Sequence, residues 1–298
     1  MEREFYFRRV GNALSEQSLN FSNRILHSHT TRFEKHEKDS GLSIKLAING
    51  PEDYFIGPSR FKVTSGRYLL VNRHQEFICS IRQSVPTEGM CFYLDTEVVN
   101  GIHDSYLQSP EGLLDNDLQH RPFELMEKVY SLQENELGHY IQNILPVLRD
   151  PKKSLELDYP QVFQELSEHL VRSQLEIRKQ LSRISNAKRS TREEIFRRVS
   201  KVRNFIDENF LNELCLEELA SLACLSKFHF LRCFKEVYDI SPYQYVIKRR
   251  LEHGKRLLGG PKASLSEIAY QIGFTDRRAF NKAFKKAFGL SPAEFRAG

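Results

Sequence analysis

The 298-residue sequence predicts an α+β protein, with a small antiparallel β-barrel or sandwich near the N-terminus and an all-helical C-terminal domain. Two observations lead to this prediction. Short strand-like segments separated by Gly and Pro breaks fill the region from Leu42 to Asp95, which is typical of a sandwich or barrel. Apolar residues then recur at helical spacing from Pro122 onward, and the last third contains a helix-turn-helix pattern twice.

The charge of the chain is distributed unevenly. Residues 186–298 contain 22 Lys and Arg against 13 Asp and Glu, a net charge of +9, whereas residues 1–185 contain 22 against 26, a net charge of −4. A basic segment joined to an acidic one is typical of a nucleic-acid-binding module attached to a second domain. The chain begins with no signal-peptide pattern and has no membrane-length apolar run, so we expect a cytoplasmic protein without a membrane partner.

Strands are expected in the first hundred residues. An opening strand is expected at Phe5–Phe7, and six more at residues 42–48, 54–56, 60–63, 67–72, 77–82 and 90–95. Thr87-Glu88-Gly89 reads as the turn between the last two. Residues 30–41 are a charged run without alternation, so a solvated loop is expected there. Six aromatic residues in the strand region are candidates for lining a ligand cavity or for plain core: Tyr54, Phe61, Tyr68, Phe77, Phe92 and Tyr93.

One spacing in this region suggests metal chemistry. His27, His29, Glu34 and Gly41 follow the pattern H-x-H-x4-E-x6-G, which resembles the first metal motif of cupins. The leading Gly of that motif is missing, and His74, in the stretch that resembles the second cupin motif, is isolated and reads as a turn residue. We therefore predict no bound metal, no cofactor and no catalytic residues, while a metal-dependent cupin enzyme stays open as an alternative.

Three helices are expected after the strands, at residues 122–132, 136–148 and 159–185. In the third, Phe163, Leu170, Ile177 and Ile184 recur every seven residues. Such a seam packs either against its own domain or against a second protomer. We favour packing against its own domain, and a homodimer remains a second expectation.

The C-terminal stretch from Ser264 to Gly298 predicts two helices joined by a tight turn, then a short third helix. Ser264 and Glu267 have capping-box spacing, Gly273 is suited to end the first helix, and Gly289 to end the second. An earlier copy of this pattern begins at Leu214, offset by 49 residues before the turn and by 50 after it. A linker helix from Pro242 to Leu258 joins the two copies.

The repeated motif, LSxxxFxRxFK followed by SPxxY in the first copy and GFTDxxxFxxxFK followed by SPxEFR in the second, resembles the DNA-binding domain of the AraC/XylS family. The resemblance implies seven helices, two helix-turn-helix units and control of transcription, usually activation. It also implies a sensing or dimerisation domain, commonly cupin-like. We expect domain bounds of 1–185 and 192–298, a linker at 186–191, and DNA, RNA polymerase and a small-molecule effector as partners.

The resemblance also implies roles for residues on recognition helices at about 227–237 and 276–287. Arg pairs well with guanine and Asn with adenine, whereas apolar side chains contact thymine methyl groups. Expected base readers are Lys227, Phe228, Leu231, Arg232, Arg277, Arg278, Asn281 and Lys282. Expected phosphate contacts are Lys235, Ser241, Arg249, Arg250, Lys285 and Ser291. A non-specific architectural DNA binder is the remaining alternative.

Overall fold

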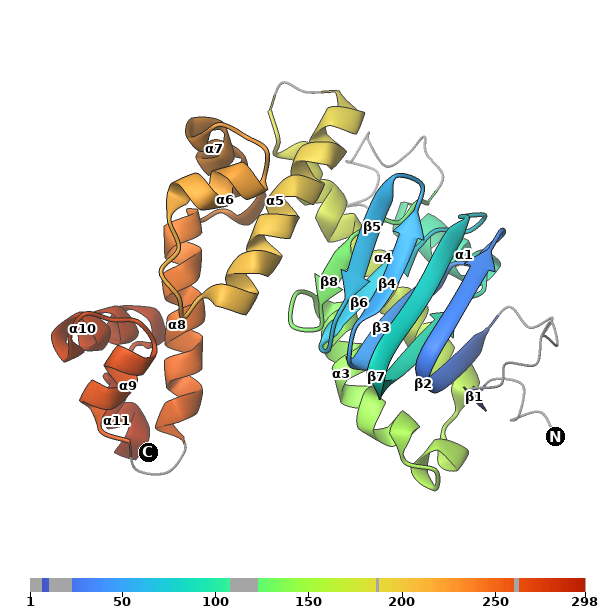
Figure 1. Ribbon diagram of the computed structural model, residues 1–298, viewed down its shortest axis with the longest axis horizontal. Coiled ribbons are helices and arrows are strands. Elements are labelled where there is room, and N and C mark those ends of the chain that lie inside the picture. The colour runs from blue at the N-terminus through green and yellow to red at the C-terminus, as the bar shows by residue number, and fades with distance from the viewer. Residues whose placement is uncertain (1–6, 11–22, 108–122, 186–187, 260–262, 298) are drawn as a thin grey trace. The chain divides into compact units, whose positions relative to one another are not determined.

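The computed structural model describes residues 7–10, 23–107, 123–185, 188–259 and 263–297. The chain forms two compact units, Met1–Arg178 and Lys179–Gly298. The division falls inside helix α4 (Tyr159–Ser182), a few residues before the expected domain end at 185 (Figure 1). Within the described ranges, no helix is long and apolar enough to cross a membrane.

The N-terminal unit is built on one strongly curved sheet. Its strands are β1 (Phe7–Val10), β2 (Arg24–Glu37), β3 (Ser43–Asn49), β4 (Glu52–Ile56), β5 (Ser59–Val63), β6 (Arg67–Val71), β7 (Phe77–Tyr93) and β8 (Val129–Ser131). The pairing order is β1-β2-β7-β3-β6-β8, and β4 pairs with both β5 and β7. β7 therefore bonds to β2 along one edge and to β4 and then β3 along the other, which makes it the central strand.

The expected turn at Thr87–Gly89 is wrong, because β7 runs through it without a break. Glycine is needed at position 89 because a side chain of another strand approaches the backbone closely there, and not because the chain turns. A Cβ at this position would lie 2.0 Å from Oε1 of Glu52 on the neighbouring strand β4. Only glycine leaves room for the buried Glu52 carboxylate here.

The expected loop at residues 30–41 is also wrong, since residues 24–37 form the 14-residue strand β2. Two features hide its alternation in the sequence. Several inward-facing positions are polar, among them Ser28 and Thr30, and a register shift between Thr30 and Arg32 moves the inward phase to Phe33. A bulge of this kind reverses which residues face inward beyond it.

The expected helix at 122–132 is a third correction. Its second half forms strand β8, in which Tyr130 stacks on Tyr68 of β6 with ring centroids 5.2 Å apart.

β1 begins at Phe7, so Phe5 and Tyr6 of the expected opening strand lie outside the described residues. Helix α1 (Thr96–Leu107), which the sequence analysis did not predict, follows β7.

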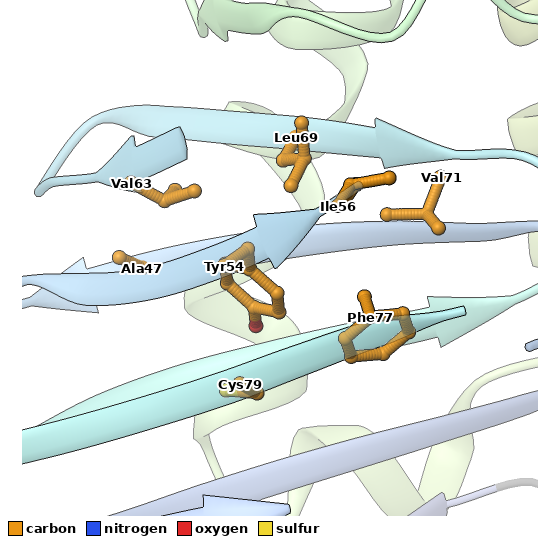
Figure 2. Close-up of a cluster of buried hydrophobic side chains, with 8 residues drawn as sticks. All are labelled: Ala47, Tyr54, Ile56, Val63, Leu69, Val71, Phe77 and Cys79. Carbon is orange, nitrogen blue, oxygen red and sulfur yellow. The ribbon is translucent and has the colours of Figure 1, made fainter. Parts of the chain in front are cut away.

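The other expected helices of this unit are present as α3 (Glu136–Arg149) and α4, with the short 3-10 helix η2 (Lys153–Glu156) between them. The seven-residue seam of α4 is buried inside the protomer, with Phe163, Leu170 and Ile177 no more than 5% exposed. Ser173 on the same face accepts a hydrogen bond from the backbone N–H of Leu137. Packing against its own domain is therefore confirmed. Figure 2 shows part of the barrel core, where buried apolar side chains from strands β3 to β7 pack against one another.

The C-terminal unit contains seven helices in its described residues, as the resemblance implied. They are α5 (Arg189–Asn209), α6 (Leu216–Leu222), α7 (Lys227–Tyr238), α8 (Pro242–Leu258), α9 (Leu265–Gln271), α10 (Arg277–Phe288) and α11 (Pro292–Ala297). α5 begins three residues before the expected start at 192. Gly254 of α8 packs tightly against the second helix pair, because a Cβ there would lie 2.8 Å from Cδ1 of Ile272.

Candidate nucleic-acid interface and barrel cavity

Two helix pairs of the C-terminal unit, α6–α7 and α9–α10, share one local design. Ser264 caps α9 in a full capping box with Glu267, and Asp276 caps α10 by accepting from the N–H of Ala279. Gly273, in the turn between them, has a φ of 82°, which glycine adopts without strain. Four residues separate α6 from α7 and five separate α9 from α10, so the one-residue offset of the repeat falls in the turn, as predicted.

Helix α10 presents a cationic face to solvent. Arg277, Arg278 and Lys282 are exposed, and none of them forms an ion pair with a described residue. Asn281 is half-buried between them, and its Oδ1 lacks a hydrogen-bond partner among the described residues. The opposite face is held in the core by Phe280 and Phe284, which are fully buried. The four expected readers of this helix therefore lie together on one side, where the three cations are exposed and the Asn281 Oδ1 is buried.

Helix α7 differs, because its cations are engaged within the protein. Lys227 pairs with Glu217 of α6, and Arg232 lies 4.0 Å from Glu236 one turn later. Phe228, in the first turn of α7, is 87% exposed, which is unusual for a large apolar side chain. Leu231 is half-buried. The expected reading face of α7 is thus mainly apolar.

Of the expected phosphate contacts, Lys235 and Lys285 are exposed on α7 and α10. Ser241 and Ser291 cap α8 and α11. Each accepts from a backbone N–H three residues on, while its own N–H donates to the side chain of Gln244 or Glu294. Their hydroxyl and amide groups are consequently already hydrogen-bonded within the protein.

Arg249 and Arg250 are engaged within the protein, and their expected phosphate contacts remain a prediction. Arg249 is paired with Asp207 and Glu252, each at 2.8 Å. Arg250 donates three hydrogen bonds to backbone carbonyl oxygens, from Nε to Phe210 at 2.7 Å, from Nη2 to Asn212 at 2.9 Å and from Nη1 to Gly273 at 2.7 Å. Burial lowers the pKa of the Arg250 guanidinium. Arg250 therefore ties α8 to the chain before α6 and to the turn before α10.

The N-terminal unit holds a cavity of about 120 Å³ inside the curved sheet. Its lining includes apolar Leu26, Phe77 and Ile81, together with polar side chains of β2, namely Ser28, Thr30 and the ion pair of Lys35 with Glu37. Two ionisable side chains inside it are almost fully buried: Lys45 on β3 is 1% exposed and Glu52 on β4 is 3% exposed. A cavity that combines apolar side chains with convergent polar ones is a candidate small-molecule site.

The two buried ionisable side chains, Lys45 and Glu52, form separate contacts. Lys45 Nζ donates to the hydroxyl of Tyr93 at 3.0 Å and lies 4.2 Å from the centroid of the Tyr93 ring. Burial opposes the charge of Lys45, but Tyr93 and Cys91 outweigh it, so the pKa of the ammonium is raised. Tyr54 donates to Glu52 Oε2 at 2.7 Å. Burial raises the pKa of Glu52 to about 7, although the Tyr54 hydrogen bond and the Lys45 charge act in the opposite direction.

The suggested metal motif does not converge on this cavity. The inward positions of β2 are Leu26, Ser28 and Thr30, so the alternating His27 and His29 lie on the other face of the strand. His27 Nε2 lies 2.9 Å from Glu88, whereas Glu34 pairs with Arg82 at 2.5 Å. No group of three metal-ligating side chains occurs within the part of the chain that the structure describes. His74 sits at a turn with a φ of 60° and pairs with Asp39.

The sequence analysis found part of the cavity and missed its polar centre. Tyr54, Phe77 and Tyr93 line it as expected. Tyr68 and Phe92 are instead core residues, and Phe61 packs against the barrel core. The signal for Lys45 was present in the sequence, as a single lysine inside the apolar strand segment LSIKLAI. Glu52 gave no comparable signal, because it follows Gly50-Pro51 and reads as part of a turn.

Comparison with known families shows matches over both units. The AraC-like ligand binding domain matches residues 20–182, and the helix-turn-helix domain matches residues 219–298. The probable transcriptional regulator LumQ of Photobacterium leiognathi is 33% identical over 92 residues, which are 31% of this chain and 37% of LumQ. The transcriptional activator RhaS of Klebsiella pneumoniae is 30% identical over 101 residues, 34% of this chain and 36% of RhaS.

Among solved structures, the DNA-binding domain of AdpA in complex with a target DNA is 30% identical, with a TM-score of 0.32, over 33% of this chain and 89% of that domain. The chain covers little more than a third of the length of LumQ and RhaS. The ligand binding domain match alone spans more than half of the chain. The chain therefore belongs to the AraC family, with an AraC-like ligand binding domain followed by a helix-turn-helix domain.

Proposed function

We propose that this protein is a sequence-specific DNA-binding transcription regulator in which α7 and α10 read bases and the N-terminal barrel controls them. The observation that carries the proposal is the exposed face of α10, where Arg277, Arg278 and Lys282 have no ion-pair partner among the described residues. The major groove of DNA admits an α-helix, and guanine presents hydrogen-bond acceptors there. A capped helix whose exposed face has three cations without ion-pair partners among the described residues therefore suits the major groove.

The two reading helices have different tasks in this proposal. Arg277 and Arg278 contact guanine. Asn281, whose buried Oδ1 has no hydrogen-bond partner among the described residues, turns its amide outward to contact adenine. On α7, Phe228 contacts thymine methyl groups, and Leu231 lies beside it. Lys227 and Arg232 must break their ion pairs with Glu217 and Glu236 before they can contact DNA. Breaking these ion pairs costs free energy, so each contact contributes less to the free energy of DNA binding. α10 is therefore the more discriminating reader.

Phosphate contacts position these helices without reading sequence. Lys235 near the end of α7 and Lys285 near the end of α10 are the exposed cations assigned to this task. α8 sets the spacing: its 17 residues make a rod of about 25 Å at ~1.5 Å per residue. Sites one turn of DNA apart are separated by ~34 Å, so a rod of this order suits successive major grooves on one face.

The barrel supplies control in this proposal. Its cavity has the size and lining of a site for a small effector. We favour activation of transcription over repression, because RhaS is named a transcriptional activator. Activation then requires RNA polymerase as a partner. A homodimer remains part of the proposal, although the α4 seam does not support it, being buried within the protomer.

Genome-wide footprinting of the purified protein tests the proposal. We expect discrete protected sites upstream of a limited set of genes, and their loss when Arg277 and Arg278 are both changed to Ala. Lys62→Ala, which removes an exposed cation of the barrel, is the matched control and should leave the sites unchanged. Uniform protection across the genome would instead identify a non-specific architectural binder.

A further inference from the structure

The barrel cavity contains a buried lysine, Lys45, that forms no ion pair with a described carboxylate. Lys45 is 1% exposed, and no described carboxylate lies within ion-pair distance of its Nζ. Its contacts are the Tyr93 hydroxyl at 3.0 Å and the faces of the Tyr93 and Phe77 rings at 4.2 and 5.1 Å. These contacts help to keep the ammonium charged, but neither a tyrosine hydroxyl nor an aromatic ring supplies the opposite charge with which a buried charge is ordinarily paired.

The carboxylate that shares the cavity does not fill this role. Glu52 is hydrogen-bonded to Tyr54, and burial raises its pKa to about 7, so a substantial fraction of it is protonated at neutral pH. The rest of the lining includes apolar side chains, Leu26, Ile81 and Phe77 among them, and the ion pair of Lys35 with Glu37 at 2.9 Å. Because Lys35 is already paired, Lys45 is the buried cation of the lining that lacks an ion pair with a described carboxylate.

The size of the chamber limits what can occupy it. Its volume is about 120 Å³. An apolar protein cavity of about 150 Å³ accommodates benzene, so the chamber suits a body of about six heavy atoms. A protonated lysine has no lone pair with which to attack a carbonyl, so a non-covalent anion is the occupant that its charge favours.

We infer that the cavity binds a small organic monocarboxylate, whose carboxylate pairs with Lys45 Nζ and whose apolar body fills the chamber. This inference rests on the proposed control by the barrel and names the chemical class of the effector. Pairing with the ligand completes the charge balance that the protein leaves open. Tyr93 holds the ammonium in place because its hydroxyl accepts a hydrogen bond from Lys45 Nζ.

Calorimetric titration of the full-length protein at about pH 6.5, in the absence of DNA, tests this inference. The probes are hexanoate and benzoate, each compared with its neutral amide, and acetate as a carboxylate without an apolar body. We expect both acids to bind about ten-fold or more tightly than their amides, since charge-assisted hydrogen bonds are the stronger ones. Equal binding of acid and amide, binding of acetate as tight as that of hexanoate, or no binding of any probe would overturn the inference.

Variants then assign the preference to Lys45. Lys45→Met keeps the length of the side chain and removes its charge, so the preference for acid over amide should disappear. Lys62→Met on the exposed side of β5 is the matched control and should retain it. Acid binding by a folded Lys45→Met protein at wild-type affinity would contradict the assignment. If Lys45→Met does not fold, the comparison of acids with amides on the wild-type protein still decides.

Failure here and failure of the proposed function are separate outcomes. Calorimetry without DNA reports the occupancy of the cavity alone. Discrete genomic footprints without carboxylate binding would overturn only this inference. Carboxylate binding without discrete footprints would overturn the DNA-reading proposal.

Discussion

Arg250 Nη1 lies 2.7 Å from the carbonyl oxygen of Gly273, so the linker helix α8 is bonded directly to the turn that precedes α10. The same guanidinium donates to the carbonyl oxygens of Phe210 and Asn212, which precede α6. One side chain therefore fixes both helix pairs to the same rod. A Cβ on Gly273 would lie 2.7 Å from the Arg250 guanidinium carbon, so glycine at 273 and arginine at 250 depend on each other.

Changing Arg250 to Met should destabilise the C-terminal unit. The substitution removes three hydrogen bonds from a charged donor, and we expect a loss of about 2–3 kcal/mol in the free energy of unfolding, measured by urea denaturation. DNA affinity should fall alike on all sequences, because the spacing of the two reading helices is loosened. The slope of log binding constant against log salt concentration should be the same for the variant as for the wild type. A slope reduced by about one would instead identify Arg250 as a phosphate contact.

The reading residues of α10 are tested by their effect on specificity. Arg277→Ala or Arg278→Ala should cost about 1–3 kcal/mol on a specific site and much less on random DNA. Lys285→Ala, on the same helix, is the comparison. It should weaken all sequences equally and reduce the salt slope by about one. If gel-shift titrations show equal losses on specific and random DNA for the arginine variants, these residues are not base readers.

The buried carboxylate of the barrel predicts a pH dependence of stability. The pKa of Glu52 is raised to about 7 in the folded protein, so folding favours its protonated form. The stability that this group contributes is therefore complete below its unfolded pKa and is lost as the pH rises through about 7. Glu52→Gln should match the wild type near pH 4 and exceed it near pH 8 by up to about 3 kcal/mol, because each pH unit between the unfolded and folded pKa values is worth about 1.4 kcal/mol.

Thermal unfolding of the two proteins across this pH range measures the difference. Tyr54 can donate to the glutamine oxygen as it does to Glu52, and Lys45 is unchanged, so the substitution removes only the ionisation. A Glu52→Gln protein that is less stable than the wild type near pH 8 would show that Glu52 is retained as a charged partner of Lys45.

The close approach at Gly89 gives a purely steric prediction. Gly89→Ala places a methyl group 2.0 Å from the buried Glu52 carboxylate, and overpacking of this kind costs about 1–3 kcal/mol. Gly101→Ala in α1 is the matched control, because a Cβ there has no neighbour within 4 Å. It should be neutral or stabilising by up to about 1 kcal/mol. Equal unfolding midpoints for the two variants would contradict the prediction.

The C-terminal unit could be predicted closely because its signals are local. The linker helix was expected from Pro242 to Leu258 and has these bounds, and the caps at Ser264 and Gly289 are as predicted. Caps and helical periodicity depend on residues within a few positions of one another, so a single sequence reveals them. The sequence did not indicate the contacts of Arg250, nor the pairing of Arg249 with Asp207, because these partners are distant in sequence.

The barrel was harder to predict because its pattern depends on distant strands. The alternation of β2 is hidden by polar residues that face the cavity and by the shift after Thr30. Gly89 reads as a turn residue, and only the position of Glu52 on another strand explains it. The cavity could not be located for the same reason, since Lys45, Glu52 and Tyr93 meet through the curvature of the sheet.

The most direct test of the central claim is methylation-protection footprinting on an isolated genomic site. If α7 and α10 read successive major grooves, two protected segments should appear on one face of the DNA, about ten base pairs apart. Arg277→Ala should remove protection from one segment and leave the other. A single protected segment in the wild-type complex, or loss of both segments in the variant with its fold intact, would contradict the account.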